Sequence, residues 1–162
     1  MNKSNAWIAA ALVLASAGAA AQAGSPPAST GDLLARGRYM VLTGHCNNCH
    51  TAGYIGKQGD VPEQEWLLGN PVGFRSDFGT AYASNLRLTV RSFSEEQWVT
   101  YAKGAKPRPP MPWWSVHETS ESDLRAMYKF IVSLGAAGQA VPAFVPADKE
   151  PLPPYEVRRL VR

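Results

Sequence analysis

The sequence contains only two cysteines, little excess charge and, after its first 23 residues, no long hydrophobic run. Cys46 and Cys49 are too close together to cross-link a fold, which excludes a disulfide scaffold. A formal net charge of +3 is too small to indicate a nucleic-acid-binding face. No internal repeat is visible, and no alternating apolar pattern indicates a strand. These absences leave one modest domain with no integral membrane span in the mature chain.

The first 23 residues have the pattern of a secretory signal peptide. Lys3 precedes an uncharged, alanine-rich run over residues 6–20, and Ala21-Gln22-Ala23 is the small-x-small site that a signal peptidase cuts. An uncleaved membrane anchor is the alternative, but the apolar run is short for a spanning helix. We therefore expect an exported, periplasmic protein that begins at Gly24 and is only weakly basic.

Proline and glycine are abundant in the rest of the chain, which holds all 13 prolines and 13 of the 14 glycines. Apolar spacing and capping residues predict short helices over residues 32–43, 94–104 and 120–135, with a helical turn within 63–68. The proline-rich residues 141–162 are expected to be extended, either wrapped on the surface or partly disordered. The predicted organisation is a signal peptide over 1–23, one domain over 24–140 and a tail over 141–162. Because so few helices build only a small core, something else has to fill the middle of the domain.

Cys46-Asn47-Asn48-Cys49-His50 is a C-x-x-C-H segment, the attachment signal for c-type haem. Residues three apart share one side of a helical turn, so both thiols can form thioethers with the haem vinyl groups while His50 lies under the iron. Three other interpretations compete. A thioredoxin-like redox pair needs a preceding strand, a plain disulfide leaves His50 unexplained, and a zinc site needs four ligands. For zinc, only His45, His50 and His117 are available to join the cysteines.

The sequence resembles the class I c-type cytochromes, in particular the single-haem domains of bacterial dehydrogenase-associated cytochromes. The resemblance covers about residues 32–135 and rests on four segments: 36–39 before the C-x-x-C-H motif and Thr51, 78–85, 110–113 and 123–128. It implies an all-α cytochrome c fold, in which short helices and long loops surround one covalent haem c. It also implies that the N- and C-terminal helices cross, with Gly37 and Tyr128 at the crossing. The implied partner is a redox protein, either a donor dehydrogenase or a terminal acceptor.

The sixth iron ligand has to come from a distant loop. Met111 lies in a rigid Pro-Pro-Met-Pro stretch outside any predicted helix, and its position in the resembling family also favours it. Met40 and Met127 fall on the apolar faces of predicted helices, where core packing is the simpler interpretation. His117 is the rival ligand and would give a bis-His haem.

Other residues are assigned around this predicted centre. Tyr82, Asn85 and Trp113 are candidates to contact the haem edge or its propionates, since buried propionates need hydrogen-bond donors, although each also suits an ordinary loop position. His45 is expected to cap a helix end or to lie exposed. The carbonyl that holds the His50 ring is expected near Pro62 or Pro71. Three tryptophans are expected to fill the core or to line the haem crevice, namely Trp66, Trp98 and Trp114.

A His/Met pair fills the iron coordination sphere, which favours electron transfer over chemistry at the iron. We therefore expect an electron carrier and not an enzyme, either a free shuttle or the cytochrome subunit of an oxidoreductase. The alternative is a haem enzyme, a peroxidase or sulfur-compound oxidase, with a displaceable or bis-His sixth ligand. A gas or redox sensor would usually carry an output domain, and none is visible. Three basic residues ahead of Met111, namely Lys103, Lys106 and Arg108, are expected to form a positive rim that guides docking.

Overall fold

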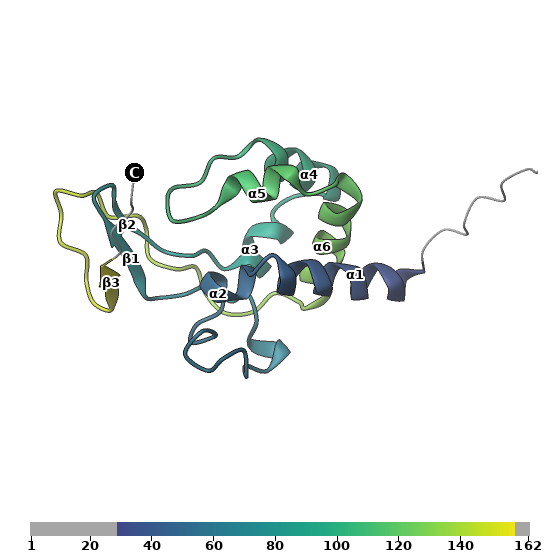
Figure 1. The fold of residues 1–162 in the computed structure, drawn as a ribbon, viewed down its shortest axis with the longest axis horizontal. Helices are drawn as coiled ribbons and strands as arrows, with labels where there is room; N and C mark the ends of the chain where they lie inside the picture. Colours follow the sequence, from purple (N-terminus) through teal and green to yellow (C-terminus); the bar gives the residue numbers. More distant parts are fainter. Residues whose placement is uncertain (1–28, 158–162) are drawn as a thin grey trace, which may run out of the picture.

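A computed structural model describes residues 29–157, so the predicted signal peptide at 1–23 and residues 158–162 lie outside it. Helices are the main regular structure of the described residues (Figure 1), and none of them is long and apolar enough to cross a membrane. In chain order the elements are α1 (Thr30–Thr43), α2 (Cys46–His50), the 3-10 turn η1 (Glu63–Glu65), β1 (Gly73–Ser76), β2 (Gly79–Ala81), α3 (Leu86–Arg91), α4 (Glu95–Gly104), α5 (Trp113–Glu118), α6 (Glu121–Ser133) and β3 (Tyr155–Val157).

The three longest helices begin at serine caps, as the sequence predicts for two of them. Ser94 and Ser120 accept hydrogen bonds from the backbone N–H groups of Gln97 and Asp123, which confirms the predicted starts of α4 and α6. The cap of α1 is Ser29, slightly before the predicted start, and it forms a capping box with Asp32. The serine caps depend on hydrogen bonds between residues three apart, so local sequence is enough to locate the starts of these helices.

Helices α1 and α6 cross at Gly37, as the resemblance implied. A Cβ atom at this position would lie 2.1 Å from the carbonyl oxygen of Ala126 and 2.7 Å from the Cβ of Phe130. The aromatic residue at the crossing is therefore Phe130, not Tyr128. The Tyr128 hydroxyl points elsewhere and donates a hydrogen bond to the carbonyl of Phe93, at 3.0 Å. Only glycine allows the two backbones to approach this closely.

The hydrophobic core is built between α1, α4 and α6 and the segment that follows α2. Its larger buried members are Val41, Trp66, Leu67, Val90, Trp98, Val99, Leu124, Met127, Phe130 and Ile131. Trp66 and Trp98 thus lie in the core as expected, whereas Trp114 is 58% exposed and does not. The indole N–H of Trp98 donates to the Leu124 carbonyl at 3.0 Å, which satisfies the one polar atom that its burial would otherwise leave unpaired.

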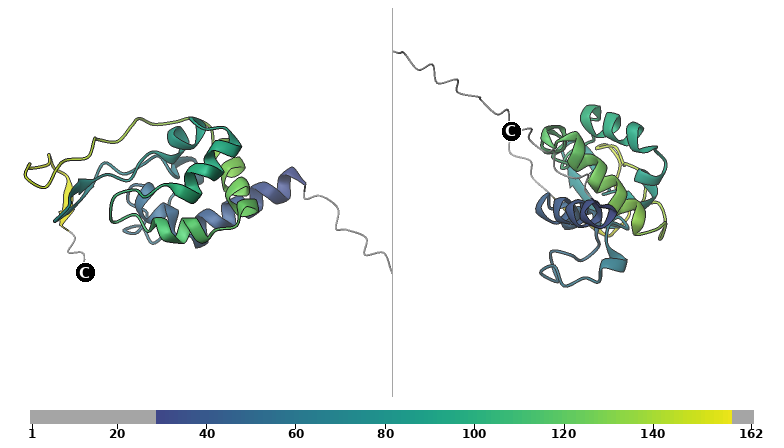
Figure 2. Two further views of the ribbon diagram at one scale, coloured as in Figure 1. Left: turned by 90° about the horizontal axis from the view of Figure 1, so that it is seen from above. Right: turned by 90° about the vertical axis from the view of Figure 1, so that its right-hand side faces the viewer.

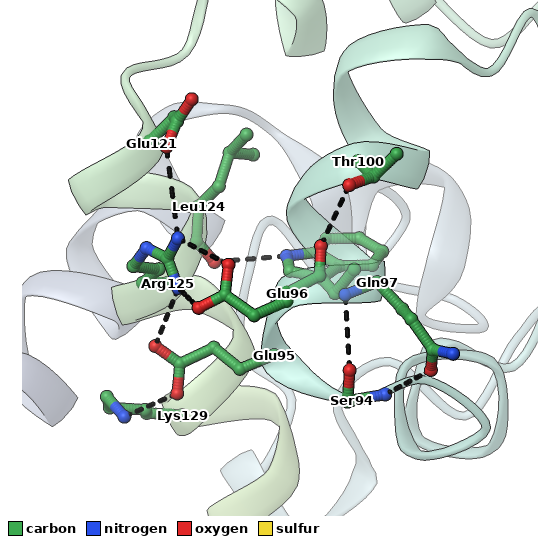
Figure 3. Close-up of polar contacts among 10 residues, drawn as sticks. Ser94, Glu95, Glu96, Gln97, Thr100, Glu121, Leu124, Arg125 and Lys129 are labelled. Atoms are coloured by element: carbon green, nitrogen blue, oxygen red, sulfur yellow. Dashed lines mark hydrogen bonds and ion pairs between the residues drawn. The ribbon is translucent and has the colours of Figure 1, made fainter.

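An ion-pair cluster joins α4 to α6 at the surface (Figure 3). Arg125 forms two hydrogen bonds with Glu96, at 2.5 and 2.7 Å, and Lys129 pairs with Glu95 at 2.6 Å. Glu121, one turn before Arg125, lies 3.8 Å from its guanidinium. Glu96 and Glu121 are exposed and the other three side chains are half-buried, so water screens these ion pairs and each contributes little to stability.

The fold is not purely helical, which corrects the all-α prediction. Strands β1 and β2 form an antiparallel hairpin, and β3 adds to β1 in parallel, giving the order β2-β1-β3. The sheet lies at the end of the molecule away from the start of α1 (Figure 2). Strands of three or four residues are too short to display an alternating pattern, so the sequence analysis missed them. Residues 141–157 of the tail contain no helix and attach to the sheet, through Val145 to Thr80 and through β3 to β1, which agrees with the extended tail wrapped on the surface.

Two short helices were also not predicted. Helix α3 is capped by Asn85, whose side-chain oxygen accepts from the backbone N–H of Leu88 at 3.2 Å. Helix α5 starts directly after Pro112. Each has six residues, which is too short for apolar periodicity to identify.

Candidate functional site

The C-x-x-C-H segment forms a helical turn of its own. Helix α1 ends at Thr43 with Gly44 as its C-cap, His45 then adopts a left-handed conformation with φ of 56°, and α2 covers the whole of the motif. The side chain of His45 is exposed and forms no cap, which agrees with the exposed position expected for it. Because His45 interrupts the helix, α2 is a separate helical turn and not a continuation of α1.

Cys46 and Cys49 are both thiols in this structure and are not joined in a disulfide. Burial raises the pKa of the Cys46 thiol to about 11, so it stays protonated at neutral pH. A helix and not a strand precedes the pair, which removes the context of a thioredoxin-like site. Within residues 29–157, no three His, Cys, Asp or Glu side chains gather closely enough to hold a metal ion, so the zinc interpretation has no ligand set.

His50 is buried and its ring is held by one hydrogen bond. Its Nδ1 atom lies 2.7 Å from the backbone carbonyl of Ser84. A carbonyl can only accept, so Nδ1 carries the proton and Nε2 has the lone pair that a metal needs. Burial lowers the pKa of His50, an effect that the hydrogen bond to Ser84 partly opposes. The expected acceptor near Pro62 or Pro71 was wrong: it is Ser84, just before Asn85.

Hydrogen bonds also attach the end of α2 to the segment 67–69. Thr51 donates from its hydroxyl to the side-chain oxygen of Asn47 and accepts from the N–H of Leu67, both at 2.8 Å. The N–H of Gly69 donates to the His50 carbonyl, also at 2.8 Å. The His50 backbone and ring are therefore both fixed by parts of the chain that follow it in sequence.

Met111 lies in the loop between α4 and α5, outside any helix, as predicted. The loop is folded tightly, because the N–H of Met111 donates to the Arg108 carbonyl at 3.2 Å and the N–H of Trp113 donates to the Met111 carbonyl at 3.0 Å. Figure 1 shows the loop extending from α4 and α5 toward the end of the molecule that holds α2 and the sheet. Met40 and Met127 instead pack with the hydrophobic core, as expected.

His117, the rival ligand, has its side chain engaged inside the protein. Its Nε2 atom lies 2.9 Å from the Ala105 carbonyl, so Nε2 carries a proton and cannot bind iron in this arrangement. The ring also packs against Trp113, with 4.9 Å between centroids. These contacts tie α5 to the start of the loop that contains Met111.

The three predicted haem-edge residues occupy different environments. Asn85 is buried, and its amide nitrogen donates to the carbonyls of Ala137 and Gln139, at 2.8 and 3.3 Å. Tyr82 is half-buried beside β1, where its ring would be 3.0 Å from a Cβ at Gly73. Trp113 is half-buried at the start of α5. Contact of these residues with a cofactor stays a prediction.

The basic residues before Met111 have partners within the protein. Lys103 donates to the His117 carbonyl at 2.8 Å, the Lys106 ammonium lies 5.4 Å from the Trp113 ring centroid, and the Arg108 guanidinium lies 4.1 Å from the Phe144 ring centroid. All three contacts brace the loop. These residues therefore do not form only a solvated positive rim, because each also contacts another part of the protein.

The chain is similar to the fructose dehydrogenase cytochrome subunit of Gluconobacter japonicus. The two sequences are 26% identical over 136 residues, which covers 77% of this chain and 25% of the relative. The chain thus spans about a quarter of the length of that protein. No protein-family model matches the sequence, and no solved structure matches it.

Sequence reasoning missed Ser84, Thr51 and Gly69 as residues that hold His50. Ser84 contributes a backbone carbonyl, a group that every residue carries, so no sequence signal could identify it. Thr51 directly follows the motif, and its hydroxyl gave a weak signal that a local hydrogen bond forms there.

Proposed function

We propose that this protein is an exported electron carrier with one haem c attached covalently through Cys46 and Cys49, and with His50 and Met111 as axial ligands. It works as a shuttle or as the cytochrome subunit of an oxidoreductase. The observation that carries the proposal is the hydrogen bond from His50 Nδ1 to the Ser84 carbonyl, on the same helical turn that presents the two thiols. The thiols are the groups that thioether formation needs, and a neutral imidazole with a free Nε2 is the form that binds iron.

The chain's residues have separate tasks in this proposal. The haem supplies a one-electron iron couple when it is bound. Cys46 and Cys49 hold the group in place, and the Ser84 carbonyl keeps the ring of His50 in one tautomer and orientation. A histidine and a thioether are both neutral, and the soft sulfur favours ferrous iron, so Met111 raises the reduction potential relative to a water ligand.

Two observations support Met111 over His117 as the sixth ligand. The Met111 side chain is half-buried in a loop without regular structure, whereas Nε2 of His117 is engaged with the Ala105 carbonyl. Ligation by His117 would require this hydrogen bond to break or the ring to use Nδ1. The haem-enzyme alternative requires an open or displaceable sixth position, and no contact in the described residues favours it.

The similarity to a dehydrogenase cytochrome subunit supports a role beside an oxidoreductase. We propose that the physiological partner is a redox protein, a dehydrogenase that donates electrons or an acceptor that removes them. Since the chain spans about a quarter of that relative, its partner and the substrate of any associated dehydrogenase are not transferred from it.

The first test is the intact mass of the denatured, acid-extracted protein after export. We expect a chain that starts at Gly24 and carries the mass of one haem, because thioethers survive extraction. Replacing either Cys46 or Cys49 by Ala should leave at most one thioether and weaken retention of the haem. Free extraction of haem from the unmodified chain would refute covalent attachment, and a retained N-terminus would refute the signal peptide.

The second test replaces Met111 by Ala. The methionine-to-ferric-iron charge-transfer band should disappear, cyanide should bind the ferric iron readily, and the reduction potential should fall, because water replaces a soft ligand. Met40→Leu and Met127→Leu are the matched controls and should leave the visible spectrum unchanged. If His117→Ala opens the iron instead, the haem is bis-His. If cyanide already binds the unmodified protein rapidly, the haem-enzyme alternative gains support.

A further inference from the structure

Residues 135–157, here called the C-terminal strap, run from the end of α6 along the length of the molecule to the sheet (Figures 1 and 2). The strap ends in β3, which pairs with β1. Along the way its backbone also pairs with β2: the N–H of Thr80 donates to the Val145 carbonyl at 2.7 Å, and the N–H of Val145 donates back at 3.0 Å. A segment of this composition, rich in proline and without a helix, is thus attached at several separate points.

One point of attachment lies on the loop that contains Met111. Phe144 of the strap packs under the Arg108 guanidinium, 4.1 Å from its ring centroid, and Arg108 accepts the backbone hydrogen bond of Met111. Phe144 itself is held in place because the adjacent Val145 pairs with Thr80. The loop therefore rests on a ring that the sheet anchors, although Arg108 and Phe144 are far apart in sequence.

A second point of attachment lies beside the residues that hold His50. Asn85 follows Ser84 directly, and its amide nitrogen donates to the strap carbonyls of Ala137 and Gln139. Gly69, which donates to the His50 carbonyl, is in the left-handed region with φ of +88°. A Cβ there would lie 2.6 Å from Cγ1 of Val141 in the strap, so the strap passes directly against this glycine.

We propose that the C-terminal strap positions both axial ligands: Phe144 braces the Met111 loop through Arg108, and the 137–141 part braces the Ser84 and Gly69 contacts of His50. This proposal rests on the proposed function, in which His50 and Met111 are the ligands of the haem iron. Because one segment contacts both sides, loosening it at either point should increase local opening there without disrupting the α1–α6 crossing. Phe144 and Asn85 are positioning residues in this scheme.

The test uses the full haem-loaded protein and hydrogen exchange of backbone amides. Phe144→Ala should speed exchange of the two amides of this loop that donate backbone hydrogen bonds, those of Met111 and Trp113, by roughly threefold, the loss expected for one partly exposed cation–aromatic contact. Arg108→Gln removes the same contact from the loop side. It should produce a similar change, with no further increase in the double variant. Phe78→Ala removes an aromatic ring that is 53% exposed in the β1–β2 turn, and it is the matched control.

Asn85→Asp tests the second point of attachment. Aspartate is as good a helix cap as asparagine, so the start of α3 is retained, but a carboxylate cannot donate to Ala137 and Gln139. We expect faster exchange over residues 83–86 and in the strap around residue 139.

If Phe144 only contributed to global stability, Phe144→Ala would speed amide exchange uniformly over the protein. Cyanide would then bind ferric iron at the same rate as in the Phe78→Ala control. In our proposal, Phe144→Ala increases this rate by roughly the same factor as loop exchange. The brace is refuted if loop exchange in Phe144→Ala equals that of the control. The comparison of Phe144→Ala with Phe78→Ala leaves the sixth ligand the same in both proteins. A failure of Met111→Ala to open the iron therefore refutes ligation by Met111, whereas the brace is judged by this comparison of loop exchange.

Discussion

At the scale of single residues, the bond from His50 to the Ser84 carbonyl determines which ring nitrogen is available. Burial favours the neutral imidazole, and the carbonyl selects the tautomer with the proton on Nδ1. Neither effect depends on the side chain at position 84. Substituting Ser84 by another residue should therefore change little, whereas any change that moves the 83–85 backbone should alter the orientation and tautomer of the His50 ring.

The ion pair of Arg36 with Asp123 predicts a pH dependence of stability. Side-chain hydrogen bonds from Arg36, at 2.7 and 3.1 Å, hold the pKa of Asp123 below its ordinary value. A carboxyl whose pKa is lowered by folding stabilises the protein above its unfolded pKa of about 4, and the contribution is lost as the pH falls through the lowered value. Asp123→Asn should therefore reduce the free energy of unfolding at pH 7 by up to about 1 kcal/mol, since Arg36 is half exposed.

Denaturant titrations of both proteins across the acid range measure this difference. The gap between wild type and Asp123→Asn should close at low pH. Glu121→Gln in the same first turn of α6 is the control, because its carboxylate is 66% exposed and lies 3.8 Å from Arg125. A gap that persists unchanged below the lowered pKa of Asp123 would show that the variant acts through packing and not through charge.

At the scale of elements, the crossing of α1 and α6 is the contact that joins the two ends of the domain. Gly37→Ala should destabilise the protein by about 2–3 kcal/mol, because the added methyl group meets backbone that cannot move aside. Thermal or denaturant unfolding measures the loss. Gly31→Ala, an exposed position in the first turn of α1 whose Cβ would meet only the Ser29 hydroxyl at 3.7 Å, should be neutral or stabilising by up to about 1 kcal/mol. Equal effects of the two substitutions would argue against a tight crossing.

At the scale of the whole molecule, the weak positive charge becomes important only where it is concentrated. Lys106 is exposed and lies close to Met111 in sequence, so we expect it to attract anionic reactants toward the loop. Lys103 is less suitable for a test, because its ammonium also supports α5 through the His117 carbonyl.

With the proposed haem bound, reversing the charge by Lys106→Glu should slow oxidation of the ferrous protein by ferricyanide about threefold at low ionic strength. The same variant should speed oxidation by a cationic cobalt complex, and both effects should fade as the Debye length falls below about 10 Å. Stopped-flow kinetics with the two oxidants measure this, while the visible spectrum should stay the same. Changes of the same sign with both oxidants would exclude steering by charge.

The sequence by itself determined the features that depend on neighbouring residues. The spacing of Cys46, Cys49 and His50 is a local property of one helical turn, and Ser94 and Ser120 cap their helices through bonds that reach three residues along the chain. Met111 between two prolines is likewise excluded from a helix by local geometry. These features were sufficient to identify the C-x-x-C-H motif and the three longest helices.

Tertiary structure alone decided what lies against these local elements. The acceptor for His50 is 34 residues away and is a backbone carbonyl, which has no sequence signature. Strand β3 lies at the C-terminal end of the described residues and pairs with β1, which is in the middle of the chain. Its three residues are too few to show a pattern. Two further contacts likewise depend on how distant segments pack together. Arg108 lies over the Phe144 ring, and Nε2 of His117 donates a hydrogen bond to the Ala105 carbonyl. Backbone hydrogen bonds and ring contacts of this kind are available to many residue types, so only the folded chain selects among them.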